Sequence, residues 1–248
     1  GSEGVIRSFL EAKKIVKKHF SGQVLNQIKI LSDRSSPPEF GYGVGKKVVT
    51  DIFRRPIEAF AKMSEAALSR HRATQALKRD PPFRMLKEFG KWYLVQLVDN
   101  TLGWIRQSDT EKVKGCTVPE FRRSIHFKRL KEVAESYVGT PYLWGGITRA
   151  GVDCSGLVQR IFLESSSVLL PKHSESQAEV GKKVSVMKAQ VGDLFFFLEH
   201  TKKTNHVGVL LNPKEKLIIH ACLKNKKVKI EHLEDILKNY RLTDIKRI

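Results

Sequence analysis

Cys154 follows a glycine-rich stretch in the segment WGGITRAGVDCSGLVQRIFLE, which spans residues 144–164. The apolar residues after it recur with a spacing that buries one helix face, so we expect a helix to begin at or just before Cys154. Asp153 is a candidate N-cap. A thiol in the first turn lies at the positive end of the helix dipole, which favours a thiolate of lowered pKa and a nucleophilic role. The glycines around it would keep the approach open for a substrate, whereas a small buried cysteine without chemistry is the alternative.

A thiol nucleophile needs a base, and two of the eight histidines lie in neighbouring predicted strands. His206 begins HVGVLL, His220 lies in KLIIHAC, and the short NPKEK between them predicts a hairpin. The expected register places His206 opposite His220 or Ala221, with the two imidazoles about 5 Å apart at Cβ. One histidine would act as general base while the other orients it. A single strand histidine is more often a core residue, so it is the pair that indicates chemistry.

A metal centre is the competing interpretation of these residues. His200, His206, His220 and Cys222 lack the compact spacing of zinc ligands, and the three cysteines lie too far apart for a structural zinc site or a disulfide framework. We therefore expect neither metal nor cofactor. Thiol-alkylating agents, but not chelators, should abolish activity.

Charge and hydropathy limit the partners. The 248 residues carry a formal net charge of +19, and the excess of Lys and Arg is spread over both halves of the chain. This charge fits a basic solvated surface or a polyanionic partner. No interleaving of aromatic and basic residues indicates a nucleic-acid platform, so no nucleic acid is expected. The apolar runs are far shorter than the ~20 residues of a membrane span. No signal peptide is visible, which favours the cytoplasm over the periplasm or cell envelope. Nothing in the sequence indicates an oligomeric state.

The hydrophobic pattern divides the chain into an all-β part and an α+β part. Short strands predicted at 47–53, 82–89, 91–98 and 103–107 favour a small antiparallel barrel, with a helix over 57–68 inserted in one loop. After it, a helix over 127–137 precedes several strands and a short helix near 231–240, an order typical of α+β architecture. The resulting segments are an N-terminal helix and linker (1–45), the β domain (46–113), a connector (114–125) and the catalytic domain (126–248).

The blocks GTPYLWGG, GVDCSGLV, LPKHSESQ, VGDLFFF, NHVGVLL and LIIHA occur in this order over residues 126–248. Together they resemble the NlpC-type bacterial cell-wall peptidases, which are papain-like cysteine endopeptidases. The resemblance implies Cys154 as nucleophile, His206 as base and His220 as third polar residue. Tyr142, twelve positions before the cysteine, would help form the oxyanion hole with the Cys154 N–H.

The resemblance also implies a substrate. Related endopeptidases typically cut the γ-D-glutamyl–meso-diaminopimelate amide of peptidoglycan stem peptides or muropeptides, in wall remodelling or recycling. The residues implied to contact the peptide are Trp144, Asp153, Ser155 and Ser174. A muramyl-L-alanine amidase, an acyltransferase on the same fold and a catalytically silent wall-binding module are the alternatives.

The segment ATQALKRDPPFRMLKEFGKWYLVQLVDNTLGWI resembles a bacterial SH3-like domain, most closely that of muropeptide-recycling NlpC-type enzymes, which select a free N-terminal L-alanine. Their pattern has a glutamate shortly before TQ and a tyrosine before GW. Here His71 and Arg72 lie near the first position and Thr101 near the second. The carboxylate that would pair with an ammonium group is absent from its place. This argues against strict selection of a free amine, and favours longer peptides or stems attached to glycan or lipid.

Overall fold

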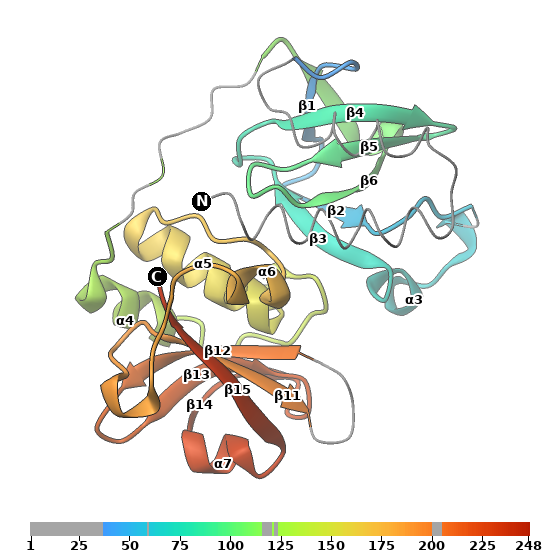
Figure 1. The fold of residues 1–248 in the computed structure, drawn as a ribbon. Coiled ribbons are helices and arrows are strands. Elements are labelled where there is room, and N and C mark those ends of the chain that lie inside the picture. Colours follow the sequence, from blue (N-terminus) through green and yellow to red (C-terminus); the bar gives the residue numbers. More distant parts are fainter. Residues whose placement is uncertain (1–36, 59, 116–120, 122–123, 200–204) are drawn as a thin grey trace, which may run out of the picture.

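The computed structural model describes residues 37–248 except 59, 116–120, 122–123 and 200–204. In this part of the chain, two antiparallel sheets lie on either side of a helical layer formed by α4 (Phe127–Glu135), α5 (Cys154–Ser166) and α6 (Ser174–Ala178) (Figure 1). The expected N-terminal helix and Cys116, one of the three cysteines, lie outside the described residues. No described helix is long and apolar enough to cross a bilayer.

The N-terminal sheet has seven strands in the order β3-β2-β6-β5-β4-β1-β7. Their bounds are β1 Tyr42–Gly45, β2 Val49–Phe53, β3 Arg72–Leu77, β4 Phe83–Phe89, β5 Trp92–Gln96, β6 Leu102–Arg106 and β7 Thr110–Val113, with a 3₁₀ turn at Gln107–Asp109. The four strands expected from the sequence are present. Their alternating inward residues form one small core, in which Ile52, Met85, Val95 and Ile105 are completely buried.

Three expectations for this region need correction. Residues 42–45 are not linker but strand β1, which pairs with both β4 and β7. The expected continuous helix over 57–68 is a 3₁₀ turn at Phe60–Lys62 followed by α3 (Glu65–Ser69). The break has a local cause, because the Ser64 hydroxyl accepts the Ala67 N–H at 3.3 Å and so caps a new helix.

The third correction concerns the barrel, because no closed barrel forms among the described residues. Strands β3 and β7 are the two edges of the sheet. All six residues of β3 are nevertheless buried, and side chains from this strand bond to the loop that precedes α5. The edge is covered by the second half of the chain instead of by a closing strand, which also protects it from pairing with another molecule. The likeness to an SH3-like domain stays a prediction.

The C-terminal sheet has six strands in the order β10-β15-β11-β12-β13-β14. Their bounds are β10 Lys182–Lys183, β11 Leu194–Glu199, β12 Asn205–Asn212, β13 Leu217–Cys222, β14 Lys227–His232 and β15 Tyr240–Arg247, with a 3₁₀ turn at Val186–Lys188 and α7 at Leu233–Leu237. A two-stranded ribbon, β8 (Ile147–Thr148) and β9 (Gly151–Val152), precedes α5. Helices followed by an antiparallel sheet confirm the expected α+β architecture.

Both faces of the C-terminal sheet are covered. Along β11, Leu194 and Phe196 join the core with α4 and α5, whereas Phe195 and Phe197 join a second core with α7. This alternation explains why the strand begins with five apolar residues in a row, LFFFL. Strands β14 and β15 were not expected from the sequence, because their many charged residues, mainly Lys and Arg, obscure the apolar pattern.

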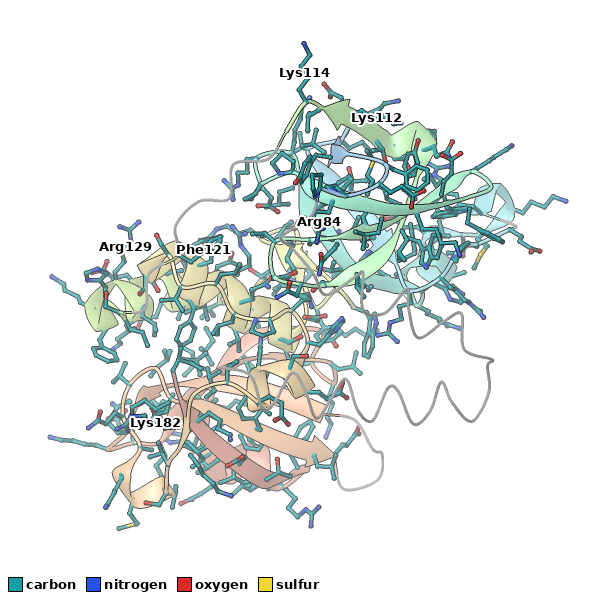
Figure 2. All side chains as sticks on the ribbon, turned by 45° about the horizontal axis from the view of Figure 1, so that its top comes forward. Arg84, Lys112, Lys114, Phe121, Arg129 and Lys182 are labelled. Carbon is teal, nitrogen blue, oxygen red and sulfur yellow. The ribbon has the colours of Figure 1, made fainter. Side chains whose placement is uncertain are left out.

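Basic side chains extend from both halves of the molecule. Lys112 on β7 and Lys114 just after it are exposed on the N-terminal half, and Arg129 and Lys182 are exposed on the C-terminal half (Figure 2). The positive charge is therefore distributed over the surface, as the sequence indicated.

Candidate active site

The helix that carries the cysteine starts where the sequence predicts. Cys154 is the first residue of α5, and Asp153 is its N-cap, whose carboxylate accepts the Gly156 N–H at 2.6 Å. The cap stabilises the helix start by about 1 kcal/mol. Cys154 is partly exposed at the floor of a cleft, and the N–H groups of Val207 and Ser155 bond its sulfur. The sulfur therefore lies beside the residue that follows His206.

Asp153 and Lys172 form a buried ion pair under this helix start. The Lys172 ammonium lies 2.8 Å and 2.9 Å from the two carboxylate oxygens, and the lysine side chain is only 1% exposed. The Gly145 N–H also bonds the carboxylate, at 2.8 Å. Every oxygen of Asp153 thus has protein donors, so the geometry gives it a structural role. Its predicted contact with a peptide stays a prediction.

Two glycines explain how the loop fits this helix start, and they correct the expectation of an open approach. A Cβ on Gly156 would lie 2.2 Å from the Gly146 carbonyl oxygen, and a Cβ on Gly146 would lie 2.5 Å from the Gly151 oxygen. These positions need glycine because backbone packs on backbone there. The glycines at 146 and 156 are therefore explained by packing within the protein and not by substrate access.

The two histidines meet at one end of the C-terminal sheet. His206 lies at the start of β12 and His220 near the end of β13, and the His206 Nε2 lies 2.8 Å from the His220 Nδ1. Their ring centroids are 5.0 Å apart, which confirms the predicted pair.

The expected register of this pair is wrong. Val209 pairs with Ile219 and Leu210 with Ile218, so the same antiparallel step brings Gly208, not His206, opposite His220. The rings meet diagonally, and the space left by Gly208 is occupied: a Cβ there would lie 3.2 Å from the His220 Cβ.

Glu231 extends this hydrogen-bonded chain and was not found from the sequence. Its carboxylate lies 2.7 Å from the His220 Nε2 and also pairs with Lys229. Tyr240, also missed, stacks on the His206 ring with centroids 4.9 Å apart and planes inclined by 24°. Both residues lie on β14 and β15, the strands that the sequence pattern did not reveal.

Burial keeps both histidines neutral. It holds the pKa of His206 well below the usual value near 6.5, and the neighbouring His220 lowers it further. Burial also lowers the pKa of His220, an effect partly opposed by Glu231. At neutral pH, each ring therefore has one protonated and one unprotonated nitrogen.

The cysteine departs from the prediction of a lowered pKa. Burial and, after it, the adjacent Asp153 carboxylate raise the pKa of the Cys154 thiol to about 12. Lys172 and the two backbone N–H groups oppose this shift without cancelling it. The helix dipole alone does not outweigh desolvation here, so the group in the free protein is a thiol beside a neutral imidazole.

Tyr142 faces the cysteine. Burial and then the charge of a Cys154 thiolate raise the tyrosine pKa, so its hydroxyl stays protonated and can donate a hydrogen bond. Its backbone pairs with Val152, two residues before the cysteine. This pairing fixes its place next to the helix start.

All of the predicted site residues border a single cleft of about 820 Å³. The structure brings together Cys154, His206, His220, Tyr142, Trp144, Asp153, Ser155 and Ser174. Ser174 begins α6, and Ser155 donates to Asp153 at 3.3 Å. The cleft wall also contains Arg54, Ala73 and Leu102, which come from the N-terminal sheet. Both halves of the chain therefore shape the site. No described group of three or more His, Cys, Asp or Glu has metal-binding geometry.

Residues 139–247 match the family model described as the NlpC/P60 family. These residues form an NlpC/P60 domain. The match begins just after α4. It includes Cys154 and the three hydrogen-bonded side chains beside it, which are His206, His220 and Glu231.

The relatives of the NlpC/P60 domain carry peptidase and hydrolase names. A probable endopeptidase of Haemophilus influenzae is 41% identical over 96 residues, 38% of this chain and 58% of that protein. A gamma-DL-glutamyl hydrolase of Bacillus subtilis is 37% identical over 117 residues, 46% of this chain and 27% of that protein. A gamma-D-glutamyl-L-lysine dipeptidyl-peptidase of the same organism is 30% identical over 146 residues, 58% of this chain and 46% of that protein.

These relatives are matched over only 27% to 58% of their own length. Among solved structures, an NlpC/P60 family protein from Bacillus cereus has a TM-score of 0.46 and 21% identity, with 88% of this chain and 66% of that chain covered.

Proposed function

We propose that this protein is a cysteine endopeptidase that hydrolyses the γ-D-glutamyl–meso-diaminopimelate amide of peptidoglycan stem peptides or muropeptides. One observation carries the proposal: the thiol of Cys154 lies in a cleft beside the His206–His220 pair, whose ring nitrogens are 2.8 Å apart. The names of the relatives, which include a probable endopeptidase and two glutamyl hydrolases or peptidases, support the substrate class.

The first step is general-base attack. The Nε2 of His206 is bonded to His220, so the Nδ1 is the nitrogen left to take the proton from the thiol. As the sulfur attacks the γ-carbonyl carbon, a C–S bond forms and the carbonyl π electrons move onto oxygen. Because the thiol pKa is raised, proton transfer accompanies attack instead of preceding it.

The oxyanion is stabilised at the start of α5. The Cys154 N–H belongs to the first helical turn, where backbone donors have no intrahelical partner, and Tyr142 offers a protonated hydroxyl. Collapse of the intermediate breaks the C–N bond, and the His206 imidazolium gives its proton to the leaving diaminopimelate amine. Water activated by His206 then hydrolyses the thioester, which releases the glutamyl γ-carboxylate and the free thiol.

Glu231 acts as a positioning residue in this mechanism. Its carboxylate can only accept, so His220 must carry its proton on Nε2 and accept through Nδ1. His206 must then donate through Nε2, which leaves its Nδ1 unprotonated. The carboxylate thus sets the tautomers of both rings and favours the imidazolium that forms during attack.

The glutamyl portion of the substrate would contact Trp144, Ser155 and Ser174, which line the cleft together with the backbone near Asp153. The N-terminal half lacks the carboxylate that would pair with a free substrate amine at the expected place. This absence favours muropeptides or attached stems as substrates, as well as free peptides. The cytoplasmic location expected from the sequence stays a prediction, which cell fractionation with an antibody against the full chain would test.

The decisive experiment is digestion of L-Ala-γ-D-Glu-meso-diaminopimelate and of the same stem on muramic acid, read by mass spectrometry. Cys154→Ala is the control. Release of diaminopimelate by the unaltered protein, but not by Cys154→Ala, supports the proposal. Cleavage of the stem on muramic acid as well would indicate a role in wall remodelling.

Other products of this digestion contradict the proposal. Cleavage at the muramyl–L-alanine bond would identify an amidase, and transfer of the glutamyl group to an added amine would identify an acyltransferase. Binding without cleavage would identify a wall-binding module.

A further inference from the structure

Arg54 brings a cation from the N-terminal sheet into the cleft wall. It follows β2 directly, and its backbone N–H bonds the His71 carbonyl at 2.9 Å, so its position is fixed by the sheet. Its side chain is exposed and borders the cleft that contains Cys154. Arg55, the next residue, is also exposed but does not line the cleft.

Trp144 holds the guanidinium of Arg54 over the cleft. The Arg54 Cζ lies 5.3 Å from the centroid of the Trp144 ring, a cation–π contact. The loop carrying Trp144 is in turn attached to the sheet, because Arg72 donates to the Trp144 carbonyl at 3.0 Å. Cation and ring are thus positioned from both halves of the chain, on the side of the cleft next to the cysteine loop.

The Arg54 guanidinium has N–H donors that are not bonded to any described residue. It makes no ion pair or side-chain hydrogen bond with any residue in the described ranges, although guanidinium has five N–H donors. The buried Asp153 carboxylate, which lines the same cleft, is already neutralised by Lys172. His173 lies close enough to sense the guanidinium charge, and burial keeps this histidine neutral at pH 7. Glu175, which is exposed in α6, also lines the cleft, and Arg72 beside the Trp144 loop is paired with Asp51.

We propose that Arg54 forms an anion subsite that binds a carboxylate on the acyl portion of the substrate, over the face of Trp144. The identity of that substrate rests on the proposed function. A planar guanidinium suits a carboxylate because two parallel N–H donors match its two oxygens. The same charge disfavours an ammonium group at this end. The subsite therefore selects acyl portions without a free amine, such as stems still attached through L-alanine.

Four peptides ending in diaminopimelate separate the charges of the acyl portion. Acetyl-L-Ala-γ-D-Glu has a charge of −1 on the glutamyl α-carboxylate, and acetyl-L-Ala-γ-D-isoglutamine has none. Succinyl-L-Ala-γ-D-isoglutamine has its charge of −1 at the N-terminal end, and L-Ala-γ-D-isoglutamine has a charge of +1. We would measure kcat/KM for each with the unaltered protein and with Arg54→Ala, Arg54→Glu and Arg55→Ala.

For the unaltered protein, we expect kcat/KM to rise about threefold to tenfold per unit of negative charge, the range of a solvent-accessible charge contact. Arg54→Ala should reduce this dependence to less than about twofold, Arg54→Glu should reverse it, and Arg55→Ala should leave it unchanged. Of the two peptides of charge −1, the one with the larger kcat/KM carries the carboxylate that Arg54 binds. Amidation of the diaminopimelate carboxylates, on the leaving group, should act equally in all four proteins.

Equal kcat/KM values for all charges, or an unchanged charge preference in Arg54→Ala, would overturn the subsite. If Arg54→Ala changes only the response to amidation of the diaminopimelate carboxylates, Arg54 does not contact the acyl portion, and this result would also overturn the subsite. Cleavage of none of the four peptides would instead contradict the proposed function. In that case, calorimetry of acetyl-L-Ala-D-Glu with Cys154→Ala and with Cys154→Ala/Arg54→Ala still tests the subsite, which requires weaker binding to the double variant.

Discussion

The carboxylate of Glu231 lies 2.7 Å from the Nε2 of His220, on the side of that ring opposite to His206. Three groups on three neighbouring strands therefore form one hydrogen-bonded chain that ends next to Cys154. Because this chain fixes the tautomers, Glu231→Ala should lower kcat about 100-fold with little change in KM. Glu231→Gln, which keeps an acceptor oxygen, should lose about tenfold.

Nuclear magnetic resonance of the ring nitrogens provides a readout that a purely structural role would not change. In the unaltered protein, both rings should be protonated on Nε2, and Glu231→Ala should give a mixture of tautomers. Glu234→Ala, an exposed carboxylate outside the cleft, is the matched control. Unchanged tautomers together with unchanged kcat would refute the role of Glu231.

Tyr142→Phe should lower kcat between about 10- and 100-fold and leave KM nearly unchanged, because the hydroxyl would bond the oxyanion and not the ground-state carbonyl. Stopped-flow measurement of thioester formation isolates the step. Tyr42→Phe, in the N-terminal sheet and away from the cleft, should behave like the unaltered protein. A loss seen only in KM would place Tyr142 in ground-state binding.

Alkylation of Cys154 by iodoacetamide should accelerate about tenfold per pH unit from pH 7 to pH 10, because only the thiolate reacts and the thiol pKa is raised to about 12. Peptide mass spectrometry assigns the modified cysteine, which matters because the chain has three. A rate that levels off below pH 8 would show that a thiolate–imidazolium pair already exists in the free protein.

The histidine pair makes folding stability depend on pH. The pKa of folded His206 lies well below its unfolded value near 6.5, so the unfolded chain binds more protons as the pH falls through 6.5. The free energy of unfolding should then fall by about 1.4 kcal/mol per pH unit for this histidine, until the folded pKa is reached. Above pH 6.5 the contribution is constant. Urea unfolding at pH 7.5, 6.0 and 5.0 should show a weaker dependence for His206→Gln.

Lys172→Met should destabilise the protein by about 3 kcal/mol or more, since it leaves the Asp153 carboxylate buried without its cation. Urea unfolding at pH 7 measures the change. Lys238→Ala breaks an ion pair on the surface and should leave the midpoint unchanged. If Lys172→Met/Asp153→Asn is as unstable as the single variant, the loss comes from packing of the lysine chain and not from the unpaired charge.

Local patterns in the sequence were sufficient to locate Cys154 at the start of its helix. The spacing after Cys154 and the capping residue Asp153 predict the start of α5 correctly, because helix caps and amphipathic spacing act within one or two turns. The hairpin between β12 and β13 could be predicted for the same reason. Its register could not, because a bulge near Leu210 shifts the pairing and brings the rings together diagonally.

Tertiary structure decided the rest. The pKa of Cys154 depends on desolvation by segments far away in the chain, which outweighs the helix dipole that the local pattern reveals. Glu231 and Tyr240 reach the histidines only through strand pairing across the sheet. Arg54 reaches the cleft only because the edge strand β3 packs on the loop before α5 instead of closing a barrel. The sequence by itself determined the helix start with its cysteine and the hairpin with its histidines, because these features are local. The packing of the two halves determined the burial of these side chains and the charged residues that line the cleft around them.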